Sequence, residues 1–298
     1  MLTKFPPTVL LTLSALFWGG NFVVGRLAHA DIPPLGLTFW RWCVAALIML
    51  PFVGRELWRH RSQIRAHFGL LFVLALTGMA MFHAFTYIAL GTTTAINATF
   101  VLASMPMVIP LVSLLVGDEH LNARQGLGIA ISIVGVGIIL SRAQVSVLMD
   151  LEFTPGDVWV LGGVLAWSVY SVVLRRKPES LPPMVLLVSS MVIAIVILLP
   201  FYVWELLNVG GFALNVQNGL VIGYVATFAS ILAFICWNTG VARIGANKAG
   251  LFIHLIPLFA SVLSIVFLGE SLKTYHFLAI GPILLGLYLT TTATSKGA

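Results

Sequence analysis

Long apolar runs follow one another along almost the whole chain, and only short polar stretches separate them. A helix needs roughly 20 apolar residues to cross the hydrocarbon core of a bilayer, where backbone polar groups must pair within the segment. The runs predict ten transmembrane helices, at residues 8–28, 35–53, 69–90, 93–116, 124–141, 156–174, 184–203, 218–241, 247–268 and 275–293. The pattern favours an all-α integral membrane protein.

Composition supports this interpretation, because 59% of the residues are hydrophobic and only 9% are charged. A soluble domain usually carries about 25% charged residues. The net charge of +6 is spread singly or in short clusters between apolar runs, which favours membrane orientation over nucleic-acid binding. Cys43 and Cys236 both fall inside apolar runs, so we expect neither a disulfide nor a metal centre, and no cofactor.

Lysine and arginine predict the orientation of the spans. With the N-terminus in the cytoplasm, the outer segments hold only Arg142 and Lys273, while Arg26 and Arg41 lie within spans. The cytoplasmic segments hold the other 12: Lys4, Arg55, Arg59, Arg61, Arg65, Arg124, Arg175, Arg176, Lys177, Arg243, Lys248 and Lys296. This asymmetry places both termini in the cytoplasm.

The second half of the chain repeats the first. Trp18 and Trp167 are 149 residues apart, Thr77 and Thr227 are 150 apart, and Pro106 and Pro257 are 151 apart. We therefore expect two five-helix repeats, residues 1–145 and 146–298, which the odd number of spans threads in opposite senses. Inverted repeats typically build transporters whose substrate site lies near the midplane. The alternative is a duplication that only made a stable bundle.

Matched side chains of the two repeats predict a central cavity. Trp18 and Asn21 share one helical face in the first span, and Trp167 and Tyr170 share the equivalent face in the sixth. These faces could form two cavity walls, or they could only pack against neighbouring helices. The full set of candidate substrate-binding residues is Trp18, Asn21, His83, Tyr87, Asn97, Ser104, Trp167, Tyr170, Trp237, Asn238 and His254.

The chemistry of these candidates suits a zwitterion with an apolar side chain, because aromatic rings, amides and hydroxyls predominate. Buried Asn and Ser could equally form ordinary bonds between helices, worth about 0.6 kcal/mol each. All ten acids lie in loops or at span ends, so no midplane carboxylate is available to carry a proton or sodium ion. This favours a facilitator or exchanger. His83 and His254 lie within spans and could instead couple protons, contact substrate or hold neighbouring helices together.

Three further residues are candidates for structural or gating roles. Arg41 lies six residues into the second span, where a cation costs about 2.5–3.5 kcal/mol on insertion scales. It could serve structure or gating, reach the interface, or bind a substrate carboxylate. Pro106 and Pro257 lie at matched places and can kink their helices, as hinges or as fixed shape. Glycines such as Gly135 and Gly286 make the fifth and tenth spans candidates for scaffold or dimer contacts, so monomer and homodimer both stay open.

Several motifs resemble a known family. The segment LSALFWGGNF at residues 13–22, with Pro33-Pro34 and Arg41, is similar to the start of EamA-type members of the drug/metabolite transporter superfamily. Gly269-Glu270 and Gly117-Asp118-Glu119 resemble the family's turn after the fourth helix of each repeat. The resemblance covers essentially the whole chain and implies a ten-helix alternating-access carrier in the cell (inner) membrane. It also implies an exporter of amino acids or related metabolites, and the aromatic-rich spans look most like the YddG-type branch, which exports aromatic amino acids.

Other classes of function are less consistent with the sequence. An enzyme would need converging acids, bases, nucleophiles or metal ligands, and the chain has no His-x-x-x-His motif and no paired cysteines. A channel would need a polar pore stripe, and no span is polar enough. We therefore expect a small-molecule carrier surrounded by lipid. The alternative is a proton-coupled exporter of other metabolites or drugs that uses His83 or His254.

Overall fold

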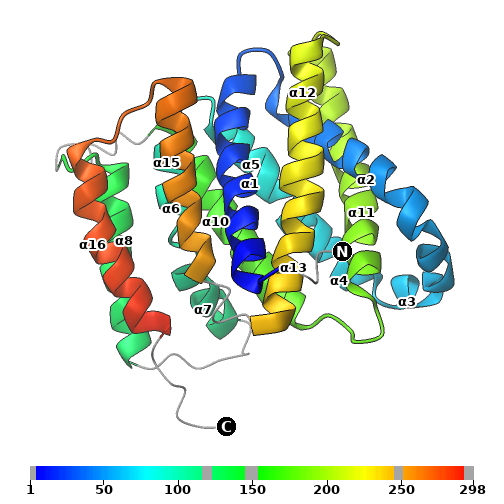
Figure 1. Ribbon diagram of the computed structural model, residues 1–298, viewed down its shortest axis with the longest axis horizontal. Helices are drawn as coiled ribbons and strands as arrows, with labels where there is room; N and C mark the ends of the chain where they lie inside the picture. The colour runs from blue at the N-terminus through cyan, green and yellow to red at the C-terminus, as the bar shows by residue number, and fades with distance from the viewer. Residues whose placement is uncertain (1–4, 116–122, 145–153, 245–250, 292–298) are drawn as a thin grey trace.

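A computed structural model describes residues 5–115, 123–144, 154–244 and 251–291, and within these ranges the chain is helical, without strands (Figure 1). The helices of the first half are α1 (Pro7–Ala28), α2 (Pro34–Arg59), α3 (Arg61–Ala66), α4 (Phe68–Leu74), η2 (Ala75–Met81), α5 (Phe82–Ala89), α6 (Ala95–Leu102), α7 (Met105–Leu115) and α8 (Ala123–Leu140). Those of the second half are α10 (Pro155–Arg175), α11 (Pro183–Asn208), α12 (Val216–Tyr224), η3 (Val225–Leu232), α13 (Ala233–Ile244), η4 (Leu251–His254), α15 (Leu255–Leu268) and α16 (Thr274–Thr291).

Six helical stretches are long and apolar enough to cross a membrane: Pro7–Ala28, Pro34–Arg59, Phe68–Ala89, Pro155–Arg175, Pro183–Asn208 and Val216–Gly240. The bent pair of α6 and α7 would be a seventh. The other apolar helices, Gly126–Ile139, Phe252–Leu268 and Thr274–Gly286, are shorter. Every predicted range contains helix, but by length and composition the described residues support six or seven spans, so ten spans stay a prediction.

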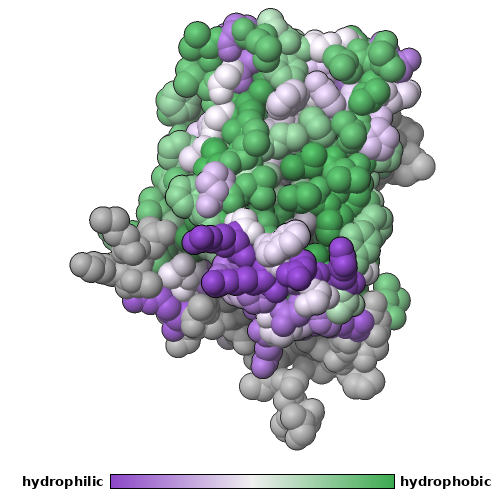
Figure 2. Space-filling model, turned by 90° about the vertical axis from the view of Figure 1, so that its right-hand side faces the viewer, coloured by the Kyte–Doolittle hydropathy of each residue, from purple (hydrophilic) through white to green (hydrophobic). Residues whose placement is uncertain are grey.

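The surface over α2 and α11 has the distribution of a membrane protein. Figure 2 shows an apolar surface over most of the height of this side and a hydrophilic band near its lower end. Phe52 on α2 and Leu207 on α11 are among the large side chains exposed there, and Arg59, Arg61 and Arg65 are exposed at the end formed by α2 and α3. An apolar surface of this size is not stable in water, so this is a multi-pass membrane protein.

Prolines mark the starts of four long helices. Pro7, Pro34, Pro155 and Pro183 each occupy the first turn of α1, α2, α10 and α11, where the missing N–H is not needed. α2 continues to Arg59, beyond the predicted end at residue 53, because its last turn is polar and helix-forming and carries an exposed ion pair between Glu56 and Arg59 (2.8 Å).

The predicted span 93–116 is broken into α6 and α7, which differ in direction by 49°. The break follows from Pro106, which has no N–H to bond the carbonyl of Leu102, the last residue of α6. In the second half, Pro257 lies in the first turn of α15, directly after the 3₁₀ turn η4. Both prolines therefore lie where helix geometry changes, and whether either is a hinge stays a prediction.

Two π-helical segments interrupt matched spans. η2 lies between α4 and α5, and η3 lies between α12 and α13. Thr77 and Thr227, one of the matched pairs in the sequence, lie inside them. Each segment widens the helix locally and changes which carbonyls are available to side chains of neighbouring helices.

The helices pack reciprocally. α1 contacts α13 and α15, while α10 contacts α5, α6 and α7. α2 packs against α11, and α8 packs against α16 at one edge of the molecule (Figure 1). The α8–α16 pair approaches closely through glycine, since a Cβ on Gly286 would lie 1.9 Å from Ser132 Oγ and 2.4 Å from the Gly128 carbonyl. This contact supports a scaffold role for the two helices, whereas a role in dimer contacts stays a prediction.

Candidate functional site

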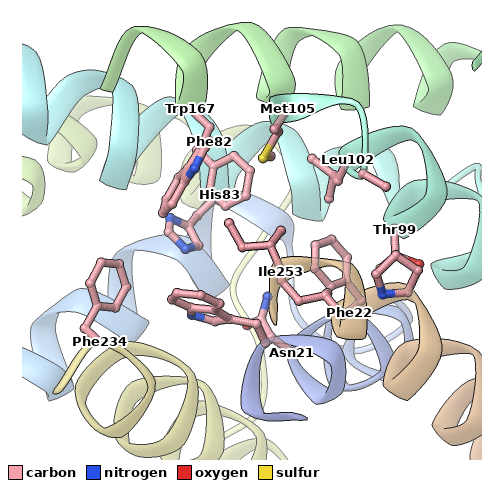
Figure 3. A pocket seen from close by; sticks show the side chains of 14 residues that line it. Asn21, Phe22, Phe82, His83, Thr99, Leu102, Met105, Trp167, Phe234 and Ile253 are labelled. Atoms are coloured by element: carbon pink, nitrogen blue, oxygen red, sulfur yellow. The ribbon is translucent and has the colours of Figure 1, made fainter. Parts of the chain in front are cut away.

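A cavity lies in the middle of the bundle, between helices of both halves. Its empty space, including the part open to solvent, measures about 620 Å³. The lining residues come from α1, α5, α6, α7, α10, α13, η4, α15 and the turn after α6. They are Trp18, Asn21, Phe22, Phe82, His83, Thr99, Leu102, Ala103, Met105, Trp167, Phe234, Ile253, Ile256 and Pro257 (Figure 3).

Aromatic rings form one side of the cavity. The Trp18 ring lies edge to face with Trp167 (6.5 Å between centroids) and with Phe234 (5.7 Å), and Phe82 packs on Trp167 at 4.7 Å. The indole N–H of Trp18 donates to the Ala229 carbonyl at 3.2 Å. This bond holds the ring in place and uses its polar edge, so Trp18 contributes mainly apolar surface to the cavity.

A buried cation lies directly behind this wall. Arg41 is 0% exposed, so it does not reach the membrane interface. Its guanidinium donates to Ser230 Oγ (2.6 Å), Tyr87 Oη (2.8 Å), Asn21 Oδ1 (3.1 Å) and the Ala229 carbonyl (3.3 Å). None of these partners is a carboxylate, so the guanidinium keeps its positive charge uncompensated by any of the groups it bonds.

Asn21 lies between Arg41 and the cavity, and its amide bonds the guanidinium. Its Oδ1 accepts from Arg41 and also from the Tyr87 hydroxyl at 2.7 Å. Because arginine can only donate, the orientation of the amide is fixed, with the oxygen toward Arg41. The Nδ2 group has no hydrogen-bond partner among the described residues, and Asn21 lines the cavity. Polarisation by Arg41 makes this N–H a stronger donor.

His83 has a similarly fixed orientation. Its Nδ1 lies 3.1 Å from the Met79 carbonyl, and a carbonyl can only accept, so Nδ1 carries a proton. The neutral ring then leaves Nε2 as an acceptor, and no partner for it lies within the described residues. The ring packs between Trp42 (5.1 Å) and Phe82 (4.9 Å). Figure 3 shows His83 and Asn21 directed toward the same space from different helices.

The π-helical segments provide the carbonyls that hold these groups. Met79 in η2 accepts from His83 and from the Trp42 indole (3.1 Å each). Ala229 in η3 accepts from Trp18 and Arg41. One carbonyl from each half therefore positions a pair of side chains behind the cavity wall. The sequence carries no recognisable signal for this arrangement.

The structure brings together only part of the predicted site. Trp18, Asn21, His83, Trp167 and Pro257 line the cavity. Three others support it from behind: Tyr87 bonds Asn21, Tyr170 packs on Trp167 at 5.0 Å, and Trp237 packs on Trp18 at 5.5 Å.

The remaining candidates lie elsewhere. Asn97 lies at a second pocket near the start of α16, and Ser104 is buried with its hydroxyl bonded to the Val101 carbonyl at 2.7 Å. Asn238 and His254 are half-buried and outside the lining. Pro106 lies in α7, but its side chain is outside the described part of the structure.

Several lining residues were not among the predicted ones. Phe22 follows Trp18 by four residues, so the helical stripe of the first span could have included it. Phe82 and Phe234 offer only the weak signal of aromatic residues within spans. Thr99 lies inside α6, Met105 follows the break after α6, and Ile253 lies in the 3₁₀ turn η4, where the direction of the chain changes.

Comparisons with known proteins agree with the interpretation of the chain as a multi-pass membrane protein. The EamA-like transporter family matches residues 6–141 and 154–292. The chain belongs to the EamA-like transporter family. Similar proteins include an uncharacterized transporter of Archaeoglobus fulgidus (27% identity, covering 95% of this chain and 96% of that protein) and the uncharacterized transporter YyaM of Bacillus subtilis (24%, covering 94% and 91%). Protein PagO of Salmonella typhimurium is 23% identical, over 97% of this chain and 94% of that protein.

A crystal structure of a protein with 18% identity has the same fold, with a TM-score of 0.62 over 98% of this chain and 99% of that chain. The family and the names of these relatives indicate a membrane transporter that takes a small-molecule substrate, and not an enzyme. Among the described residues, no group of three His, Cys, Asp or Glu side chains could hold a metal ion.

Proposed function

We propose that this EamA-family protein is an alternating-access exporter of small metabolites, namely amino acids with aromatic or other apolar side chains, working as a facilitator or exchanger. One observation carries the proposal. The central cavity combines an aromatic wall with a fixed donor, Asn21 Nδ2, and a fixed acceptor, His83 Nε2. A free amino acid offers the complementary groups: a carboxylate, an ammonium and an apolar side chain.

Each part of such a substrate has a partner in the cavity. The carboxylate accepts a hydrogen bond from Asn21, whose amide dipole points its positive end away from Arg41 and into the cavity. The ammonium donates to Nε2 of His83. The side chain lies among Trp18, Phe82 and Trp167. Binding the carboxylate through an amide keeps the interaction weak enough for release, which a carrier requires.

The two five-helix halves, 1–145 and 146–298, provide the conformational change in this proposal. The reciprocal contacts of α1 and α10, the matched π-helical segments and the two separate family matches all support an inverted duplication with ten spans. Two halves of this kind can exchange conformations, and the exchange opens the cavity to the opposite side of the membrane.

Carboxylates of the second half bind helix starts of the first half. Glu205, near the end of α11, accepts from the N–H groups of Leu35 (3.1 Å) and Gly36 (2.6 Å) at the start of α2. Glu270, after α15, accepts from the first N–H groups of α6 (3.0 and 3.1 Å). In the predicted topology both contacts lie at the outer end. We infer that they close this end and must break or rearrange when the substrate leaves.

The alternative is a proton-coupled exporter of other metabolites or drugs. Within this alternative, the position of His83 in the cavity wall favours proton coupling through His83 over coupling through His254, which does not line the cavity. Protonation at Nε2 would change His83 from an acceptor to a donor and would thereby release an ammonium group.

Transport in proteoliposomes distinguishes these possibilities. We expect saturable uptake of labelled aromatic amino acids that unlabelled substrate inside the vesicles accelerates. Trp167→Ala removes the central aromatic wall and is expected to reduce this uptake strongly, whereas Trp159→Ala, on the same helix but outside the cavity lining, is expected to leave it near the wild-type rate. Equal uptake by wild type and Trp167→Ala would exclude the cavity as the substrate site.

An imposed pH gradient provides the second arm of the experiment. A facilitator or exchanger transports at the same rate with and without the gradient. Uptake that follows the gradient, and loses this dependence in His83→Gln while counterflow persists, would replace the proposal with the proton-coupled alternative.

A further inference from the structure

A second pocket lies at the end of the bundle where α6 and α16 begin and α8 ends, at the upper left of Figure 1. Its empty space is about 1030 Å³, open solvent included. It does not share lining residues with the central cavity. Two cations, Arg142 and Lys273, line it together with the amide of Asn97 and the ring of Tyr275.

The amide of Asn97 is fixed with its donor unpaired. His276 Nδ1 accepts from the backbone N–H of Lys273 (2.9 Å), so Nε2 must carry the proton and donate to Asn97 Oδ1 (2.8 Å). The Tyr275 hydroxyl donates to the same oxygen at 3.3 Å. Asn97 is 8% exposed, and its Nδ2 group has no hydrogen-bond partner among the described residues. This donor is not among the fully buried polar atoms without a partner, so it faces the open pocket, where a ligand can accept from it.

Arg142 occupies a backbone position that normally belongs to glycine. Its φ is +53°, its N–H bonds the Ile139 carbonyl (3.1 Å), and the N–H of Ala143 bonds the Ile138 carbonyl (2.9 Å). These are the two bonds of the Schellman motif that ends α8, with Arg142 in its left-handed position. A non-glycine residue is strained there, and the next residue, Ala143, has the same left-handed conformation (φ +57°). The side chain of Arg142 is a cation on the pocket wall.

The charges around the pocket favour an anion. Arg142 and Lys273 are the only cations that the sequence places in the outer segments, where lysine and arginine are disfavoured. Glu270, three residues before Lys273, directs both carboxylate oxygens to N–H groups of α6 and does not line the pocket. The charged groups on the pocket lining are therefore two cations, and the neutral polar ones include the amide of Asn97 together with Thr92, Thr93, Thr94, Gln144 and Thr274.

The apolar surface next to the pocket indicates which anion binds. Leu278 lies on the pocket wall and is 55% exposed, and its neighbour Phe277 is 62% exposed. About two turns further along α16, Leu284 and Leu285 are also exposed. We propose that this pocket binds the phosphate of an anionic glycerophospholipid, whose acyl chains lie along the exposed face of α16. The pocket is thus a lipid site on the α8–α16 pair.

Lipid titration followed by native mass spectrometry of the purified full-length protein in neutral detergent tests this site. The probes are phosphatidylglycerol, phosphatidylcholine and inorganic phosphate. Removing one of the basic residues that bind an anionic headgroup is expected to weaken lipid binding about fivefold, and removing both is expected to weaken it about thirtyfold. The test variant combines Arg142→Gly with Lys273→Gln. Because glycine suits the left-handed position better than arginine, this variant is expected to keep its fold and melting temperature.

The matched control is Arg55→Gln with Arg65→Gln, which removes two exposed arginines near the opposite end of the bundle. We expect wild type and control to bind phosphatidylglycerol more tightly than phosphatidylcholine, and the test variant to lose this preference. Equal binding of the two lipids to wild type, or an unchanged preference in the test variant, would overturn the proposal. Displacement of phosphatidylglycerol by millimolar phosphate would identify a site for free oxyanions and would also overturn it. None of these outcomes depends on substrate transport.

Discussion

Replacing Asn21 with aspartate reverses the polarity that α1 presents to the central cavity while nearly preserving the side chain's shape. The oxygen that accepts from Arg41 (3.1 Å) and Tyr87 (2.7 Å) remains in place. The Nδ2 donor becomes a carboxylate oxygen. The new charge lies next to the buried Arg41, so the folded protein is expected to tolerate the substitution.

The cost to substrate binding follows from the lost donor. A hydrogen bond to a charged group is worth about 1.5–3 kcal/mol, which corresponds to roughly 10- to 150-fold in affinity. Repulsion between the new carboxylate and the substrate carboxylate adds to this loss, and the neighbouring Arg41 charge offsets part of it. We therefore expect Asn21→Asp to bind phenylalanine or tryptophan at least about tenfold more weakly.

Equilibrium binding of matched ligands to the purified protein provides the assay. Wild type should prefer phenylalanine to phenylalaninamide, which lacks the carboxylate, and Asn21→Asp should lose or reverse this preference. The matched control is Asn238→Asp, which makes the same exchange in α13 outside the cavity lining. If a folded Asn21→Asp protein bound phenylalanine as tightly as wild type, the assignment of Asn21 to the substrate carboxylate would be refuted.

Three further substitutions test the packing by thermal unfolding. Gly78→Ala places a Cβ 2.2 Å from Cδ2 of Tyr170 and is expected to destabilise the protein by about 1–3 kcal/mol. Glu270→Ala removes the acceptor at the start of α6 and is expected to cost about 0.5–2 kcal/mol, with Glu270→Gln in between. Gly286→Ala places a Cβ 1.9 Å from Ser132 Oγ and is expected to lower the melting temperature without changing substrate affinity, because α8 and α16 do not line the cavity.

Each of these expectations has a contrary result. A wild-type melting temperature for Gly78→Ala would mean that the aromatic wall is loosely packed. A Glu270→Ala protein as stable as wild type would mean that the contact with α6 contributes nothing in the bilayer. Weakened substrate binding in Gly286→Ala would couple the α8–α16 pair to the cavity.

Hydropathy alone located the helices, because the requirement to bury apolar side chains and pair backbone groups acts over whole segments. The face containing Trp18 and Asn21 was also predictable, since α1 is one regular helix and spacing determines its faces. The interpretation of Asn97 and Ser104 assumed one continuous helix. The break after Leu102 separates them and leaves Asn97 bonded to His276.

Other features depend on contacts between distant segments and were not accessible from local patterns. Tyr87 was a candidate substrate-binding residue, but its hydroxyl contacts Arg41 and Asn21 behind the cavity wall. The three roles considered for Arg41 could not be separated, because they differ only in which partners the fold brings to it. The carbonyls of the π-helical segments are likewise bonded by side chains from α1 and α2, which are distant in the sequence from the carbonyls that they contact.

The opposite threading of the two halves is tested most directly by cysteine labelling in cells. Ala30 and Glu179 are exposed, precede the matched starts of α2 and α11, and lie 149 residues apart. Each is replaced by cysteine in a background where Cys43 and Cys236 are alanine. A membrane-impermeant maleimide should label the cysteine at position 30 in intact cells and the cysteine at position 179 only after permeabilisation. Labelling of both positions from the same side would contradict the inverted duplication, and with it the proposed exchange of the cavity between two compartments.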